Sequence, residues 1–512
     1  MSTTWQPIVE NPLVEGLARP PVHPASLVIF GATGDLTRRK LLPAIYNLAH
    51  EGSLPERFNL VGVSRRDIGG DDGLREIVRK AVRDFSRRSP DEQVLARLLE
   101  NARYVAGQLD DPETYRGLEA ALGGFDAQAN QRLNRCIYLA TAPVLFPVIV
   151  EQLGASGLNR LQDADVRIVI EKPFGTTLTE AAQLNRDVLD VFDESQVFRI
   201  DHYLGKETVQ NMMALRFANG MLEPLWNRNY VDHVQITAAE EIGIGTRAAF
   251  YDSIGALRDL IQNHMLQLLC HMAMEPPIDF TADEVRNEKV KVLRAIATPS
   301  PQEIPSIAVR AQYVGGTVGG EHVRGYVEED RVPEGSATET YAALKLYVQN
   351  WRWAGVPFYL RAGKRLPRKL TEISVALKAA PHVAFGQEGS TGVGPNHLTL
   401  AVQPNEGVSL SLAAKVPGRG MRIRPVNMQF LYGNTFLSQS PEAYERLILD
   451  AMRGDATLFT RNDEVEAQWR ICDPILEVWR AMPGRLPQYA AGSQGPAEAE
   501  SILAPGQAWR RI

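Results

Sequence analysis

The chain has 512 residues, of which 44% are hydrophobic and 23% are charged, and its formal net charge is -6. This length predicts about two to four globular domains, and the acidic balance excludes the basic surface that nucleic-acid-binding proteins carry. No apolar run reaches the roughly 18 residues of a membrane span, and the start of the chain does not resemble a signal peptide. With only Cys136, Cys270 and Cys472 present, we expect a cytoplasmic protein without a membrane or nucleic-acid partner. The histidines show no metal-binding spacing, so we predict no metal site.

The first structured segment is predicted to bind a dinucleotide. Residues 1–24 are rich in proline and read as a flexible arm, whereas Ser26 to Phe30 form an apolar run typical of a buried parallel strand. A glycine turn follows, and then apolar residues at helical spacing. Glycines in such a turn let the backbone approach a pyrophosphate at the helix start. The candidate cofactor residues are Gly31, Ala32, Thr33, Gly34, Asp35 and Leu36. Because the pattern lacks the complete G-x-G-x-x-G, an ordinary tight turn is the alternative.

The second apolar strand, Phe58 to Val63, is followed by Ser64-Arg65-Arg66. At this position an NAD enzyme usually presents an acidic residue to the ribose, whereas an arginine accommodates a 2′-phosphate. Arg65 therefore favours NADP over NAD, and a solvated surface pair of arginines is the alternative.

Further buried strands are predicted at 136–140 and 166–170, and their alternation with helices is typical of a doubly wound parallel sheet, that is, a Rossmann-like α/β domain. The second of these strands ends in Glu171-Lys172-Pro173. Lys172 thus lies at the carboxyl end of the sheet, where ligands bind, and we expect it to contact substrate or cofactor.

The densest group of ionisable residues is Arg199 to Glu207, on a predicted strand-to-helix turn. The free N–H groups of the following helix favour an anion there. His202 and Lys206 are spaced to close on a phosphate, and Asp201 is placed to orient a base that comes from elsewhere in the chain. A charged surface loop is the alternative.

Beyond residue 230 the pattern changes to strands with few helices between them, which predicts a second, larger α+β domain on a mostly antiparallel sheet. A helix over 252–274 and helices over 441–453 and 465–480 are expected to accompany it. The predicted domains are a flexible arm (1–24), an NADP-binding domain (25–200), a substrate-binding and dimerisation domain (201–490) and a tail with little to bury (491–512). The predicted strands are 231–240, 290–296, 343–351, 357–362, 373–378, 397–403 and 408–414.

His264 lies on the apolar stripe of the predicted 252–274 helix. It is either a buried structural histidine or a base in a cleft, the group that a hydride-transfer enzyme needs for an alcohol proton. Nearby carboxylates suited to sugar hydroxyls are Asp259 and either Glu240 or Glu241. The basic run Arg361 to Lys369 is either a second phosphate clamp or a hydrated loop.

Taken together, these motifs resemble the glucose-6-phosphate dehydrogenase family. The residues that carry the resemblance are 31–41, 171–175, 199–207, 258–264 and 361–364, in that family's order. The resemblance implies that His264 is the general base and that Asp201 orients it. It implies a phosphate site made by His202, Tyr203 and Lys206 with help from Lys364. It also implies sugar contacts from Lys172, Glu240, Asp259 and Lys369, with Glu241 and Arg368 as alternatives to Glu240 and Lys369.

The reaction implied is oxidation of β-D-glucose 6-phosphate at C1, with hydride transfer to NADP, giving 6-phosphoglucono-1,5-lactone and NADPH. This is the first step of the oxidative pentose phosphate pathway. The alternatives are a dehydrogenase of another sugar or inositol phosphate, and a non-catalytic NADP-binding protein that has no use for Asp201 and His264. We expect a homodimer or homotetramer.

Overall fold

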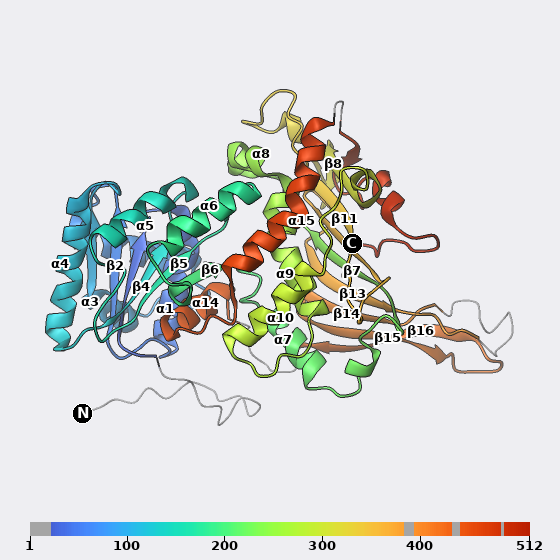
Figure 1. Ribbon diagram of the computed structural model, residues 1–512, viewed down its shortest axis with the longest axis horizontal. Coiled ribbons are helices and arrows are strands. Elements are labelled where there is room, and N and C mark those ends of the chain that lie inside the picture. The colour runs from blue at the N-terminus through green and yellow to red at the C-terminus, as the bar shows by residue number, and fades with distance from the viewer. Residues whose placement is uncertain (1–21, 383–393, 433–440, 483–485) are drawn as a thin grey trace. The chain divides into compact units, whose positions relative to one another are not determined.

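The computed structural model describes residues 22–382, 394–432, 441–482 and 486–512 (Figure 1). The predicted arm therefore lies almost entirely outside the described residues. The chain divides into two compact units. The first comprises residues 1–205, 279–286 and 441–465, and the second comprises 206–278, 287–440 and 466–512.

The first unit is the predicted doubly wound fold. Its sheet has seven strands in the order β17-β6-β5-β4-β1-β2-β3, and all neighbours are parallel except β17 and β6. The strands are β1 (Ala25–Phe30), β2 (Phe58–Ser64), β3 (Ala102–Ala106), β4 (Asn134–Leu139), β5 (Val166–Ile170), β6 (Val197–Ile200) and β17 (Phe459–Thr460). The central strands are apolar on both faces because helices cover both, which is why they read as continuous hydrophobic runs.

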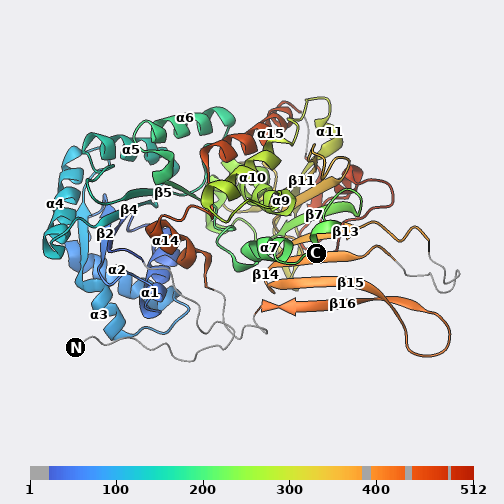
Figure 2. The same cartoon turned by 60° about the horizontal axis from the view of Figure 1, so that its bottom comes forward.

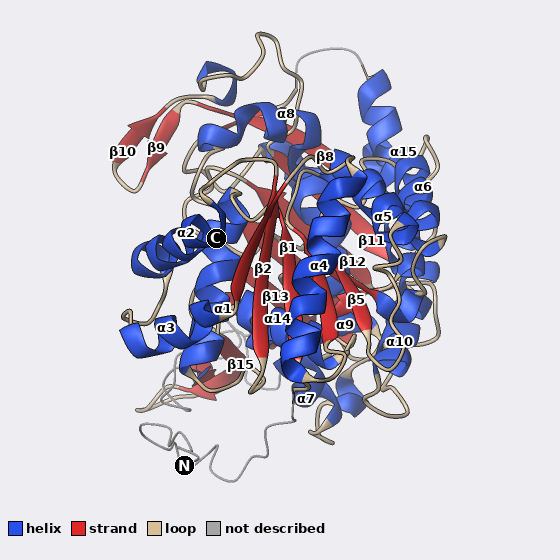
Figure 3. Cartoon of the chain, turned by 90° about the vertical axis from the view of Figure 1, so that its left-hand side faces the viewer, coloured by secondary structure: helices blue, strands red, loops and turns tan. Residues whose placement is uncertain are grey.

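Helices α5 and α6 lie on one face of this sheet, and α1 and α14 on the other (Figures 1 and 2). The strands β1 and β2 run between α1, α2 and α3 on one side and α4 and α5 on the other (Figure 3). The helices are a π-helix (Thr37–Leu41), α1 (Leu42–His50), α2 (Gly70–Phe85), α3 (Glu92–Glu100), α4 (Pro112–Ala129), α5 (Phe146–Ala155), α6 (Leu178–Leu189) and α14 (Ala443–Arg453).

The second unit is built on the predicted antiparallel sheet, which has nine strands in the order β16-β15-β14-β13-β7-β12-β11-β8-β18. Only the pairs β7–β12 and β8–β18 are parallel. The strands are β7 (Val231–Ala239), β8 (Ala308–Val314), β11 (Tyr341–Tyr347), β12 (Pro357–Gly363), β13 (Leu370–Leu377), β14 (His397–Gln403), β15 (Gly407–Lys415), β16 (Ile423–Leu431) and β18 (Gln488–Ala490). A separate hairpin pairs β9 (Gly316–Val318) with β10 (Glu321–Val323).

The predicted helix over 252–274 corresponds to three consecutive segments, and Gly255, with φ 74°, interrupts the helical backbone near the end of the first. The segments are α8 (Ala248–Ala256), a π-helix (Leu257–Met265) and α9 (Leu266–Ala273). The other helices are α7 (Glu207–Phe217), α10 (Ala282–Arg294), α11 (Ile304–Ile307) and α15 (Asn462–Ala481).

The strand predicted over 290–296 is wrong, because the structure has the end of α10 there and only Ile296 makes a strand-like bridge, with Val348. The β-branched valines favour a strand by composition. However, Val285, Lys289 and Val292 on α10 are all buried, and their spacing of four and three residues is that of one helical face. Packing of this face overrides the local propensity.

The prediction of a tail with little to bury over 491–512 is also wrong. Ile502 is fully buried, and the final residue, Ile512, is 8% exposed. Trp509 lies 4.7 Å from the Arg361 guanidinium, measured to the ring centroid. The segment belongs to the second unit, and its partners are on the central strands of the sheet, which a local pattern does not reveal.

Candidate active site

The glycine turn after β1 needs glycine at its first position. Gly31 has φ 90°, and a Cβ atom there would lie 2.6 Å from the carbonyl oxygen of Ala140. The Gly34 N–H and the Thr37 hydroxyl both donate to the Gly31 carbonyl, each at 2.9 Å. This turn exposes backbone at the carboxyl edge of the parallel sheet, where a dinucleotide pyrophosphate lies in folds of this type.

Arg65 follows the last residue of β2, and its side chain is exposed. The hydroxyls of Ser64 and Thr33 lie 3.0 Å apart and connect the end of β2 to the glycine turn. Arg65 is therefore next to the predicted dinucleotide turn, as the sequence requires for contact with a ribose phosphate.

Lys172 follows a buried carboxyl group. Glu171 is 8% exposed, and its carboxylate accepts hydrogen bonds from the hydroxyls of Tyr138 on β4 and Tyr444 on α14. Burial raises the pKa of Glu171 to about 7, against the opposing effect of both hydroxyls and of the Lys172 charge. Lys172 thus lies at the end of β5, beside a carboxyl group that titrates near neutral pH.

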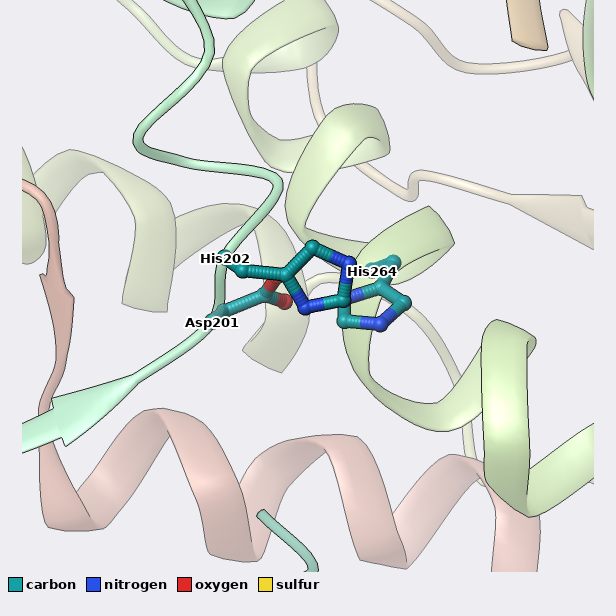
Figure 4. A group of neighbouring side chains, drawn as sticks. All are labelled: Asp201, His202 and His264. Atoms are coloured by element: carbon teal, nitrogen blue, oxygen red, sulfur yellow. The ribbon is translucent and has the colours of Figure 1, made fainter. Parts of the chain in front are cut away.

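Asp201 and His202 begin the turn that leaves β6 (Figure 4). Asp201 is 3% exposed, and its Oδ1 accepts the N–H of Tyr203 at 2.9 Å, which fixes the carboxylate in the turn. The His202 ring packs edge-on against Tyr203 and is stacked with Tyr444, with 6.4 Å between the His202 and Tyr444 ring centroids. Gly205 closes the turn, since a Cβ atom there would lie 2.8 Å from the Ala443 carbonyl.

Tyr444 is a residue that the sequence analysis missed. Its ring stacks on His202, and its hydroxyl is hydrogen-bonded to the Glu171 carboxylate. It therefore connects two motifs that the sequence could only place on the same sheet edge. No local signal marks Tyr444, because it lies on α14, in a part of the chain far from both motifs.

In the second unit, Lys206 is the residue before the first turn of α7. The first N–H groups of a helix have no acceptor within it, which favours an anion at this end. The Lys206 ammonium donates to Gln403 Oε1 at the end of β14. Gln403 was not a candidate from sequence, and it holds the lysine at the helix start.

His264 and Asp259 lie on the π-helix that follows Gly255. A side chain at Gly255 is excluded, because a Cβ atom would lie 2.3 Å from the carboxylate of Glu339. His264 is 1% exposed, and its imidazole is drawn on this helix in Figure 4. π-Helical segments are rare and occur often at functional sites, so the local geometry favours a functional reading of this stretch over a regular core helix.

Glu240, Asp259 and Lys364 come together. Glu240 follows β7 and Lys364 follows β12, and these strands are parallel neighbours paired as far as Ala239 and Gly363, so both side chains emerge at one edge. The Lys364 ammonium contacts Glu240 and lies 3.5 Å from Asp259 Oδ2. Lys364 is 1% exposed, and its ammonium lies 4.9 Å from the Tyr251 ring centroid.

The structure also shows where the two alternative pairs of sugar-contact candidates lie, Glu240 or Glu241 and Lys369 or Arg368. Glu241 points toward the β9–β10 hairpin, because its Oε1 lies 3.4 Å from the position of a Cβ atom on Gly319. Glu240 is thus the residue that pairs with Lys364. Lys369 precedes Leu370, which pairs with Ala239, so it stands opposite Glu240 in the antiparallel register. Lys369 and Arg368 are both exposed.

The described part of the chain contains no helix long and apolar enough to cross a membrane. The prediction that the chain binds no metal stays a prediction.

The chain joins a Rossmann-like unit with a glycine turn to a unit whose large mixed sheet carries a buried lysine between two partly exposed carboxylates. This combination defines an oxidoreductase that uses a nicotinamide dinucleotide. Comparison with known proteins makes the assignment specific. The family described as "Glucose-6-phosphate dehydrogenase, NAD binding domain" matches residues 28–211, and "Glucose-6-phosphate dehydrogenase, C-terminal domain" matches residues 213–510. The chain belongs to the glucose-6-phosphate dehydrogenase family.

Relatives match along nearly the whole chain. Glucose-6-phosphate 1-dehydrogenase 2 of Mycobacterium tuberculosis is 49% identical over 490 residues, which cover 95% of each chain. Glucose-6-phosphate 1-dehydrogenase of Aggregatibacter actinomycetemcomitans is 44% identical over 95% of this chain and 97% of its own. A solved glucose-6-phosphate dehydrogenase in complex with its substrate glucose 6-phosphate has a TM-score of 0.86 at 32% identity and covers 97% of this chain and 100% of its own.

Proposed function

We propose that the chain oxidises β-D-glucose 6-phosphate at C1 and transfers the hydride to NADP, giving 6-phosphoglucono-1,5-lactone and NADPH. The observation that carries this proposal is that relatives named for the activity match nearly the full length of the chain. The Glu240–Lys364–Asp259 cluster adds support, since two carboxylates around one buried ammonium suit the hydroxyl groups of a sugar.

In this mechanism His264 accepts the proton of the C1 hydroxyl. A neutral imidazole is the ordinary side chain for this task near pH 7. Asp201 orients the imidazole and stabilises the positive charge that develops on it. The buried turn that fixes the Asp201 carboxylate supports this role, because an orienting group must itself be held in place.

The phosphate is proposed to bind at His202, Tyr203 and Lys206. The start of α7 supports this location, since the positive end of the helix dipole and the Lys206 ammonium both favour an anion there. Binding energy from the phosphate, which does not react, positions C1 for the chemical step.

The sugar is proposed to contact Lys172, Glu240, Asp259 and Lys369. The sequence resemblance gives Lys364 a part in phosphate binding. Its contact with Glu240 and Asp259 favours instead a role in holding these two carboxylates toward the sugar hydroxyls.

NADP, when bound, accepts the hydride. The residues proposed to hold it are the glycine turn from Gly31 to Leu36, Lys172, and Arg65 at the 2′-phosphate. The exposed arginine beside the turn, with no acidic residue in its place, supports NADP over NAD.

We also propose that the chain forms a homodimer or homotetramer, in which the second copy covers β16. This edge strand of the sheet exposes apolar side chains, with Val426 46% and Met428 62% exposed, beside β15 (Figure 2). Exposed apolar edges favour association. Light scattering of the intact protein should give two or four copies, and Met428→Lys should lower this number. A monomeric parent protein contradicts the proposal. A cytoplasmic location stays a prediction.

The reaction is tested by following NADPH absorbance with a panel of sugar phosphates and free glucose. We expect the highest kcat/KM with glucose 6-phosphate. Preference for another sugar or inositol phosphate would favour the rival dehydrogenase, and NADP binding without turnover of any substrate would favour a non-catalytic protein.

A further inference from the structure

The turn that carries Lys364 has an unfavourable backbone conformation at the residue that follows. Arg365, the next residue, has φ 53°, a left-handed conformation that residues other than glycine seldom adopt. Such a conformation persists only where the surroundings hold it. On one side, the Lys364 N–H donates to the Thr340 carbonyl and the Leu366 N–H to the Glu240 carbonyl, each at 3.0 Å.

On the other side, both carbonyls of the turn are held by residues near the end of the chain. The Tyr489 hydroxyl donates to the Lys364 carbonyl at 2.7 Å, and the Gly492 N–H donates to the Arg365 carbonyl at 2.7 Å. Tyr489 is 3% exposed, so no solvent replaces its hydroxyl. We call residues 488–495 the C-terminal clamp.

The clamp is itself firmly placed. Its strand β18 is paired in parallel with β8. Gly492 has φ 86°, and a Cβ atom there would lie 1.9 Å from the Thr317 carbonyl oxygen. A Cβ atom on Gly495 would lie 2.8 Å from the Tyr341 ring. The clamp thus approaches its neighbours as closely as only glycine allows.

We propose that the C-terminal clamp, chiefly through the Tyr489 hydroxyl, is a positioning device for Lys364 in the reaction. The proposal rests on the role given to Lys364 above, which is to hold Glu240 and Asp259 toward the sugar hydroxyls. A lysine side chain is long, so a small rotation of its peptide plane moves its ammonium by a large distance. The hydrogen bond from Tyr489 fixes the peptide plane that follows Lys364, and the bond from Gly492 fixes the next one. Together they hold the backbone from which the Lys364 side chain reaches between Glu240 and Asp259.

The test is Tyr489→Phe in the full chain, which keeps the ring and removes only the hydroxyl. We expect KM for glucose 6-phosphate to rise about 5- to 20-fold, which lies within the effect expected when a buried carbonyl loses its hydrogen-bond donor, while KM for NADP stays unchanged. The matched control is Tyr359→Phe. The Tyr359 hydroxyl is also buried and also contacts the end of the chain, at Gln507 and Ala504, but it does not touch the Lys364 turn.

A thermal midpoint is measured for each variant, because a merely structural role would lower it in both without changing KM. Equal KM effects of the two variants, or none from Tyr489→Phe, would overturn the proposal. Tyr489→Phe should also add nothing to KM in a Lys364→Ala background, since it acts through that lysine. If Tyr489→Phe raises KM equally in the parent protein and in the Lys364→Ala variant, the proposal is contradicted.

Lys364→Ala alone distinguishes a failure of the role proposed for Lys364 from a failure of the role proposed for the clamp. If it leaves KM for glucose 6-phosphate unchanged, the proposed role of Lys364 in holding Glu240 and Asp259 toward the sugar is wrong, and the clamp has no purpose in the reaction. If it raises KM while Tyr489→Phe does not, only the clamp proposal fails.

Discussion

The hydroxyl of Tyr138 donates to Glu171 Oε1 at 2.6 Å, joining the ends of two neighbouring parallel strands. Glu171 is buried, and burial raises its pKa to about 7 although this hydrogen bond and the Lys172 charge favour the ionised form. A carboxyl group that titrates near neutral pH therefore directly precedes a lysine proposed to bind substrate.

This relationship predicts a pH-dependent stability. The folded-state pKa of Glu171 lies above its ordinary value of 4.5, so the native protein keeps the proton to a higher pH than the unfolded chain does. Protonated Glu171 contributes its full stabilisation below about pH 4.5, and this contribution is lost as the pH rises to about 7. The loss lowers the free energy of unfolding by roughly 3 kcal/mol. Glu171→Gln, which cannot ionise, should escape this loss.

Urea unfolding of the parent protein and Glu171→Gln at about pH 5, 6, 7 and 8 measures the effect. The difference in unfolding free energy should shift in favour of the variant as the pH rises. Glu113→Gln is the control, because Glu113 is exposed on α4, and its curve should follow the parent's. Parallel curves for the parent and Glu171→Gln would show that Glu171 titrates at an ordinary pKa.

His264→Asn should lower kcat by about 10²- to 10⁴-fold with substrate binding largely retained, because an amide cannot accept the proton. The matched control is His271→Asn, since His271 is equally buried on the adjoining α9 and has no proposed part in the reaction. It should lower the thermal midpoint and spare kcat. A His264→Asn enzyme that is unstable yet turns over at the parent rate would identify a structural histidine.

Asp201→Asn should also lower kcat, by a smaller factor than His264→Asn, because only the orientation and stabilisation of the imidazolium are lost. Since the Asp201 Oδ1 accepts the Tyr203 N–H, the asparagine oxygen can keep that bond and hold the turn. Measuring kcat for Asp201→Asn and His264→Asn tests whether the loss is smaller in the Asp201 variant. An unchanged kcat would remove Asp201 from the mechanism.

Lys206→Ala should raise KM for glucose 6-phosphate strongly and change kcat/KM for free glucose little, because the lysine is proposed to meet only the phosphate. Lys378→Ala is the control, since that ammonium donates to the Arg228 carbonyl and has no proposed part in substrate binding. Equal losses with both substrates would refute the phosphate assignment.

Arg65→Ala should raise KM for NADP far more than KM for NAD, by a factor that corresponds to about 1.5 to 3 kcal/mol for one charge-assisted hydrogen bond. Arg116→Ala provides the control, because that arginine is exposed on α4 and pairs with Glu113 in the same helix. Steady-state kinetics with both cofactors gives the ratio, and equal changes for NADP and NAD would contradict a contact with the 2′-phosphate.

Glu240→Gln should raise KM for glucose 6-phosphate by about tenfold or more and lower the thermal midpoint, since it leaves the buried Lys364 ammonium with one carboxylate fewer. Glu241→Gln should do neither, because Glu241 points toward the hairpin of β9 and β10. A larger effect on KM from Glu241→Gln would reverse the choice between the two.

Features that depend on short stretches of chain could be predicted from the sequence. Apolar runs such as Val166 to Ile170 specify buried strands, because both faces are covered, and the glycine turn and Arg65 indicate a dinucleotide site through their place after such strands. The motif from Arg199 to Glu207 was specific enough to suggest the family, which the comparisons confirm.

Features that join distant parts of the chain could be recognised only in the folded structure. The pairing of Glu240 with Lys364 follows from β7 and β12 being parallel neighbours, and Tyr444 reaches Glu171 and His202 from a helix late in the chain. The end of the chain looked like a loose tail because its hydrophobic and hydrogen-bonding partners, such as Arg361, lie on another strand. Local periodicity reports which face of an element is buried, whereas the identity of the partner that buries it depends on how the strands are ordered in the sheet.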